Sequence, residues 1–200
     1  MKLATRSVVL AGLALLFCAV GAHADSFLLT YSGTGISGSA NLSAFAVSGG
    51  YEVTSISGHQ TLGTTTQVIS NILLPTPVIG TYNGVNFALY SIGSTPIFTY
   101  DDLIMPGHTP ALDAFSLVFS VSGMSGDVNL CAAGSNPYTL CGSSAAPYWE
   151  LTSAGAAYAI SSLSIVRTPE PSTLLLLGAG LAGLLFLVRR KSVGRLQMQN

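Results

Sequence analysis

An uncharged, mostly apolar run near the C-terminus limits what this chain can fold into more than any other feature. Residues 173–188 read TLLLLGAGLAGLLFLV, and Arg189, Arg190 and Lys191 follow directly. A helix of that length rises about 24 Å, close to the roughly 30 Å hydrocarbon thickness of a bilayer. Basic residues beside such a span stay in the cytoplasm. We therefore predict one transmembrane helix, a basic cluster, and a short cytoplasmic tail at residues 192–200, rather than the buried helix of a soluble domain.

The N-terminus carries a second apolar segment, organised like a signal peptide. Two basic residues precede an apolar run of about 14 residues, which is short of the roughly 20 that cross a bilayer. Ala22 and Ala24 supply small side chains at the positions that signal peptidase reads. We therefore predict that residues 1–24 are a signal peptide cleaved after Ala24; an uncleaved N-terminal anchor is the alternative.

The middle of the chain is nearly free of positive charge. Between residues 25 and 168 the one basic residue is Arg167, while seven residues are acidic. Charged residues make up 8% of the chain, against about 25% in ordinary soluble domains. Such a domain has no cationic face for phosphates, so nucleic acid is not an expected partner.

The middle segment is patterned for β-structure. Phe115, Leu117, Phe119 and Val121 alternate with residues that are mostly serine, which is the period of a strand. No stretch between residues 25 and 168 shows a sustained apolar stripe with the helical period of 3.6. We therefore predict an all-β ectodomain at residues 25–168, a β-sandwich of eight to eleven short antiparallel strands.

Turn residues separate the candidate strands. Gly49 and Gly50 form one such point, and Asn83 with Gly84 forms another. Asn-Gly readily takes the positive φ values of a two-residue hairpin turn. We expect antiparallel pairing across both points.

Two cysteines, Cys131 and Cys141, remain after the predicted signal cleavage. An even pair of cysteines in an exported chain indicates a disulfide. A metal site is the alternative, but two cysteines without a nearby histidine do not complete a zinc shell. We therefore predict a disulfide between them.

Four aspartates invite a metal interpretation. Asp101, Asp102, Asp113 and Asp127 could together offer the oxygen ligands that Ca²⁺ prefers. However, no compact Asp-x-Asp-x-Asp loop is present, and Asp101 and Asp102 precede a Pro-Gly turn. We favour a solvated loop for this pair, and predict no metal and no cofactor.

Enzymatic chemistry finds little support in the sequence. His59 and His108 are the histidines of the predicted mature domain, and a secreted hydrolase could pair one of them with a serine and an aspartate. No Gly-x-Ser-x-Gly, His-Glu-x-x-His or phosphate-loop motif accompanies them. We predict that the protein is not an enzyme and keep a hydrolase as the second alternative.

Aromatic residues offer a different binding chemistry. Tyr138, Tyr148, Trp149 and Tyr158 could form a platform on which sugar rings stack, as in a carbohydrate-binding module acting in exopolysaccharide. Ordinary packing of aromatic side chains in a core is the competing interpretation.

The C-terminal elements together resemble the PEP-CTERM sorting domain of Gram-negative bacteria. Pro169, Glu170 and Pro171 come first, the apolar helix follows, and the basic cluster ends the series. The resemblance implies that an exosortase, an integral-membrane cysteine transpeptidase, recognises the Pro-Glu-Pro motif outside the inner membrane and cuts near it. Each proline fixes φ and lacks an N–H, which keeps such a segment extended.

These observations give one expectation for the whole chain. We expect an exported, non-enzymatic surface or extracellular-matrix protein, tethered to the inner membrane through residues 173–188 before it reaches the cell surface or matrix. Its expected partners are signal peptidase, an exosortase and the membrane, with exopolysaccharide as a further candidate. A carbohydrate-binding module is the first alternative function.

Overall fold

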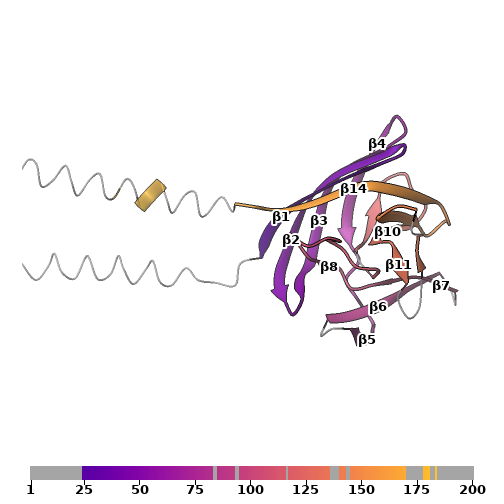
Figure 1. The fold of residues 1–200 in the computed structure, drawn as a ribbon, viewed down its shortest axis with the longest axis horizontal. Coiled ribbons are helices and arrows are strands. Elements are labelled where there is room, and N and C mark those ends of the chain that lie inside the picture. The colour runs from indigo at the N-terminus through magenta and orange to yellow at the C-terminus, as the bar shows by residue number, and fades with distance from the viewer. Residues whose placement is uncertain are drawn as a thin grey trace, which may run out of the picture.

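Long antiparallel strands dominate the computed structural model of the protein (Figure 1). It describes residues 24–82, 85–92, 95–115, 117–135, 140–142, 145–169, 178–180 and 183. Fourteen strands lie within these residues: β1 (Asp25–Gly33), β2 (Ile36–Val47), β3 (Gly50–Leu62), β4 (Thr65–Ile72), β5 (Val78–Tyr82), β6 (Val85–Ile92), β7 (Thr95–Tyr100), β8 (Leu103–Ile104), β9 (Leu117–Val121), β10 (Asp127–Ala132), β11 (Gly134–Ser135), β12 (Leu140–Cys141), β13 (Tyr148–Thr152) and β14 (Ala157–Thr168).

Eight of these strands close into a barrel. Going round the sheet, the hydrogen-bonded neighbours follow the chain order β1, β2, β3, β4, β9, β10, β13 and β14, and β14 then pairs with β1. Every pairing in the barrel is antiparallel. The all-β prediction is therefore confirmed. The predicted β-sandwich is not, because these strands form one closed sheet and not two sheets packed face to face.

The barrel interior is an apolar core built by strand alternation. Leu117, Phe119 and Val121 all point inward and are buried, as the period-2 pattern predicts. Burial of one large apolar side chain contributes about 1.5–3 kcal/mol. The largest fully buried apolar side chains in this core are Phe27, Leu29, Leu42, Ile69, Ile104, Leu112, Leu117, Phe119, Leu130 and Ile160.

Both predicted hairpins are present. Val47 of β2 faces Gly50 of β3, and Gly49 between them has φ of +92°, a conformation that glycine adopts without strain. In the second hairpin, Tyr82 of β5 pairs with Val85 of β6.

A small sheet of β5, β6 and β7 lies against the outer wall of the barrel (Figure 1). Ala88, Phe98 and Tyr100 from this sheet bury a second core against Val118 of β9, with Leu151 of β13 beside them. The outer face of β9 and β13 is therefore covered by protein, whereas the sheet adds no strand to the barrel itself.

The predicted transmembrane helix falls largely outside the described residues. Residues 178–180 and 183 are helical. Within the part of the chain that is described, no helix has both the length and the apolar character needed to cross a membrane.

Candidate functional site

The two ends of the barrel domain meet at one point. β1 begins at Asp25, directly after the predicted signal-peptidase residue Ala24, and β14 ends at Thr168, directly before Pro169. The two strands pair in antiparallel register, so that Ser26 faces Thr168. Both predicted processing points therefore lie at the same end of the barrel, as the course of β1 and β14 in Figure 1 shows.

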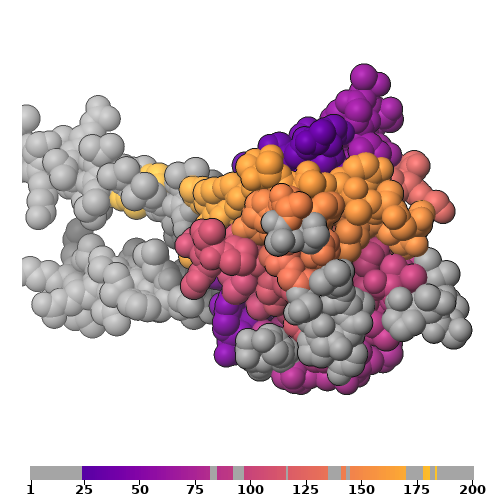
Figure 2. Space-filling model, turned by 45° about the vertical axis from the view of Figure 1, so that its right-hand side comes forward, coloured from indigo at the N-terminus to yellow at the C-terminus, as the bar shows by residue number. Residues whose placement is uncertain are grey.

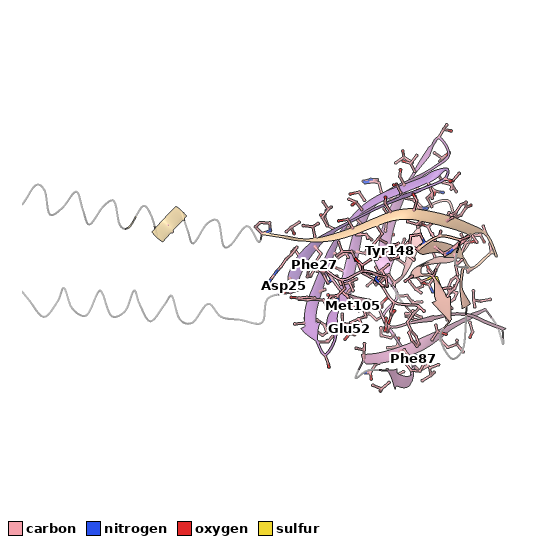
Figure 3. The ribbon with its side chains drawn as sticks, in the orientation of Figure 1. Asp25, Phe27, Glu52, Phe87, Met105 and Tyr148 are labelled. Carbon is pink, nitrogen blue, oxygen red and sulfur yellow. A yellow bond between two sulfur atoms is a disulfide. The ribbon has the colours of Figure 1, made fainter. Side chains whose placement is uncertain are left out.

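An ion pair joins β1 and β14 at this end of the barrel. The guanidinium of Arg167 donates to the Asp25 carboxylate, whose position is labelled in Figure 3. The Arg167 side chain is 62% exposed, so the pair contributes less than about 1 kcal/mol. It nevertheless joins the first residue of the predicted mature protein to the strand that leads into the Pro-Glu-Pro motif.

The remaining residues of the predicted processing signals are only partly described. Pro169 and Ala24 are exposed and lie outside regular strands. The other predicted processing residues lie outside the described residues: Ala22, Glu170, Pro171, Arg189, Arg190 and Lys191.

The predicted disulfide is present. Cys131 at the end of β10 is bonded to Cys141 of β12, with their Cα atoms 6.2 Å apart. Both cysteines are buried. The bond ties the β11–β12 excursion to the barrel wall, next to Trp149 on β13, which is the cross-strand partner of Cys131.

The four candidate calcium ligands do not form one shell. Among the described residues, no group of three or more His, Cys, Asp or Glu side chains is placed to hold a metal ion. Asp127 instead accepts a hydrogen bond of 2.7 Å from the Ser120 hydroxyl. Asp101 lies beside Asp113, while Asp102 accepts a 3.2 Å bond from the backbone N–H of Val118.

The prediction that Asp101 and Asp102 occupy a solvated loop is wrong. Their side chains are 1% and 0% exposed. Burial, and then the nearby Asp113 carboxylate, raise the pKa of Asp101 to about 8, and burial raises the pKa of Asp102 well above its usual range. The reason lies in the backbone: each carboxylate accepts from an N–H, that of Leu103 for Asp101 and that of Val118 for Asp102.

Sequence reasoning missed a polar cluster inside the barrel. Tyr31 on β1 and Gln60 on β3 flank β2, Gln67 faces Gln60 from β4, and all three are buried; Glu150 on β13 joins them. Tyr31 donates to Gln60 at 2.8 Å, and the Gln60 amide donates to Gln67 at 3.1 Å and to Glu150 Oε1 at 3.3 Å. The sequence pattern that could have revealed this cluster is a polar residue at an inward-facing position of a strand that otherwise alternates apolar and polar residues.

Glu150 carries the unusual electrostatics of this cluster. It is fully buried, and its Oε2 has no hydrogen-bond partner among the described residues. Burial raises the pKa of Glu150 to about 7, although hydrogen bonds from Tyr31 and Gln60 oppose the shift. Burial and the neighbouring Glu150 also raise the pKa of Tyr31. The carboxyl can therefore hold its proton near neutral pH.

The two candidate catalytic histidines lie apart. His59 is exposed on the outer face of β3, and His108 is exposed on the loop after β8. His108 lines a groove of about 760 Å³ between that loop and β14, together with Ser161 and Ser162. None of the described residues that line this groove is a carboxylate, so none is placed there to orient His108 toward Ser161 or Ser162.

The proposed aromatic platform is not assembled by the described residues. Tyr148 points into the barrel, where its hydroxyl accepts a 3.0 Å bond from the Ala111 N–H, and Tyr158 also packs against the barrel core. Trp149 follows Tyr148 in the strand and therefore lies on the opposite face. Tyr138 is outside the described residues.

Comparison with known proteins adds one finding. The family model described as the PEP-CTERM protein-sorting motif matches residues 167–191. No curated protein and no solved structure is significantly similar to the chain. The match begins at Arg167, inside β14, so the motif starts within the barrel wall. Residues 167–191 therefore carry a PEP-CTERM protein-sorting motif, the kind of signal that an exosortase sorting system processes.

Proposed function

We propose that the barrel is the cargo of this sorting system: a non-enzymatic surface or matrix domain that is exported, tethered through residues 173–188, and then cut by an exosortase near Pro169. Signal peptidase removes residues 1–24 at the start of this route. The observation that supports the proposal is the pairing of β1 with β14, which brings Asp25 and Thr168, the first and last residues of the barrel, to one end of a closed domain.

This geometry allows both cuts without damage to the fold. All strands of the barrel lie between Asp25 and Thr168, so cleavage after Ala24 and near Pro169 removes no hydrogen-bonded strand. Because the last strand runs directly into a proline, the chain leaves the barrel extended, which suits an enzyme cleft that binds an extended segment. The cleavage site then lies at the membrane-facing end of the domain.

Several features support a structural role for the cargo. The described carboxylates with raised pKa values do not line the groove beside His108, and three of them, Asp101, Asp102 and Glu150, are buried in the fold. A disulfide and a closed barrel without free sheet ends suit a domain that persists outside the cell. We place its final location at the cell surface or in the extracellular matrix.

The test is release from the membrane. In a host that expresses an exosortase, the double variant Pro169→Ala, Pro171→Ala should stay in the membrane fraction, because the motif is lost while the apolar span remains. Pro147→Ala, at an exposed proline before β13, is the matched control and should be released like the parent. Equal release of the double variant and the parent would show that a plain membrane anchor is the better account.

A further inference from the structure

The outer faces of β14, β1, β2 and β3 form one continuous surface, which we call the hydroxyl face. The strand registers align its side chains in four rows that run across the four strands. In order from β14 to β3, the rows are Ser162, Ser32, Ser37, Thr61; Ser164, Thr30, Ser39, His59; Val166, Leu28, Asn41, Ser57; and Thr168, Ser26, Ser43, Ser55.

The composition of this face is unusual for a solvated sheet. Twelve of its sixteen side chains are Ser or Thr, and none is Asp, Glu, Lys or Arg. All sixteen positions are exposed or half-buried. The one hydrogen bond between two of these side chains joins the hydroxyls of Ser32 and Ser162 at 2.8 Å. Most of the hydroxyls are therefore available to a partner.

The face has a regular spacing. Neighbouring strands lie about 4.8 Å apart, and residues on the same side of one strand repeat every 6.6 Å or so, that is, roughly two residues of rise. A lattice of groups that both donate and accept hydrogen bonds matches a polymer whose own groups do the same. Because the lattice carries no formal charge, it offers no complementary attraction to polyanions or to basic proteins.

An apolar pair interrupts the hydroxyl rows. Leu28 and Val166 are cross-strand partners, and Val166 is 57% exposed. Next to them a shallow depression of about 210 Å³ lies over β1 and β14, lined by Thr30, Ser162 and Ser164 among others. An apolar contact flanked by hydroxyls suits a sugar ring, which presents C–H groups on its face and hydroxyls at its rim. In Figure 2 β14 (orange) lies beside the indigo N-terminal strands along one side of the barrel.

We propose that the hydroxyl face binds a neutral polysaccharide chain, laid across β14, β1, β2 and β3 with the Leu28–Val166 pair under a sugar ring. This inference rests on the proposed function, since it names the matrix component that the exported barrel meets. It replaces the aromatic platform with a surface that has no Phe, Tyr or Trp side chain.

The experiment uses the full chain with its disulfide intact, purified in detergent from a host without exosortase. Retention is measured on three neutral insoluble polysaccharides, namely cellulose, curdlan and agarose, and on carboxymethylcellulose, which is cellulose with added negative charge. Ser39→Asp and Ser39→Lys place either charge near the centre of the face, and Val166→Ala removes one apolar side chain. Ser91→Asp and Ser91→Lys, at an exposed serine of β6, are the matched controls.

The parent should be retained on at least one neutral polysaccharide, and less on carboxymethylcellulose than on cellulose if cellulose is the one retained. Both Ser39 variants should bind about tenfold more weakly whatever the sign of the charge. Val166→Ala should bind about threefold more weakly, and the Ser91 variants should bind like the parent.

Retention on none of the neutral polymers, or Ser39 variants that bind like the parent, would overturn the proposal. So would a dimer that Ser39→Asp dissociates without any change in retention, because the face would then join copies of this chain. Normal release of a parent that binds nothing would leave the proposed function intact.

Discussion

The first and second halves of the barrel are built in different ways. β1 to β4 are 9, 12, 13 and 8 residues long, and each of the three turns between them has two residues, with glycine at positive φ: Gly35, Gly49 and Gly63. β9, β10 and β13 have only 5, 6 and 5 residues. Their connections carry the β5–β7 sheet, the buried aspartates and the disulfide.

The two halves fix the register of their strands in different ways. In the first half, short turns and alternation align neighbouring strands, with one register shift between Ser43 and Ala44, and the same regularity produces the part of the hydroxyl face that lies on β1, β2 and β3. In the second half, the short strands β9, β10 and β13 are also held by side-chain to backbone bonds, such as that of Asp102 to Val118, and by the Cys131–Cys141 link. Changes in the two halves should therefore act through different physics.

The largest expected effect is on pH dependence, and it comes from Glu150 and Asp101, both in or next to the irregular half. Their folded-state pKa values are raised to about 7 and about 8, from ordinary values of 4.5 and 3.8. At pH values between the unfolded-state and folded-state pKa values, the folded protein binds more protons than the unfolded chain. The stabilisation that these protonated carboxyls contribute is therefore complete below about pH 4 and is lost as the pH rises through the folded-state pKa values. With these pKa values the unfolding free energy should fall by about 6 kcal/mol between pH 5 and pH 9.

Urea unfolding at pH 5, 7 and 9 measures this effect. Glu150→Gln should remove the contribution of Glu150, so the variant should lose less stability than the parent on going to pH 9. A parent whose stability is constant or rises over this range would mean that these carboxyls are not buried as the structure places them.

In the regular half, we expect substitutions to lower stability through steric overlap instead of through a pKa shift. Gly38 on β2 lies between Tyr31 and Gln60 in the barrel, and a Cβ added there would lie 2.2 Å from Cζ of the Tyr31 ring. Gly38→Ala should therefore lower the unfolding free energy by about 3 kcal/mol, independently of pH. The neighbouring exposed position serves as control, and Ser39→Ala should change stability by less than about 0.5 kcal/mol.

A double variant sharpens the test of that contact. Tyr31→Ala opens the space that the new methyl group needs, so the loss caused by Gly38→Ala should shrink in its presence. Strictly additive losses would show that Tyr31 does not occupy the space over Gly38.

Removal of the disulfide should have the smallest effect of the three. Cys131 and Cys141 are separated by 10 residues, and so short a loop gives the cross-link a modest entropic effect. Cys131→Ala with Cys141→Ala should lower the unfolding free energy by about 2 kcal/mol. If thermal unfolding of exported parent and variant coincides, the bond contributes nothing to the stability of the irregular half.

The sequence predicts individual strands and turns better than it predicts the closed barrel. Alternation at Leu117 to Val121 and the turn at Gly49 are local signals, and both are confirmed. Closure depends on the pairing of Leu29 with Ile165, which are far apart in the chain. Alternation in a strand is the same in a sandwich and in a barrel, so no local pattern distinguishes the two.

Some features of the candidate site could likewise be recognised from local sequence, and others could not. The sorting motif is a contiguous sequence signal and could be recognised without a structure. Burial of Asp101 and Asp102 could not, because it depends on the N–H of Val118, which comes from a strand later in the chain. The Tyr31–Gln60–Glu150 cluster likewise combines three strands, and its members become neighbours only when the barrel closes.

Intact-mass analysis of the protein released by an exosortase-positive host tests the central claim most directly. The account predicts one species that begins at Asp25, ends close to the Pro-Glu-Pro motif, and is two hydrogens lighter than its reduced form because Cys131 and Cys141 are bonded. Such a species contains every strand of the barrel and none of the apolar span. A released protein that still contains residues 173–188, or one that has lost part of β1 or β14, would contradict it.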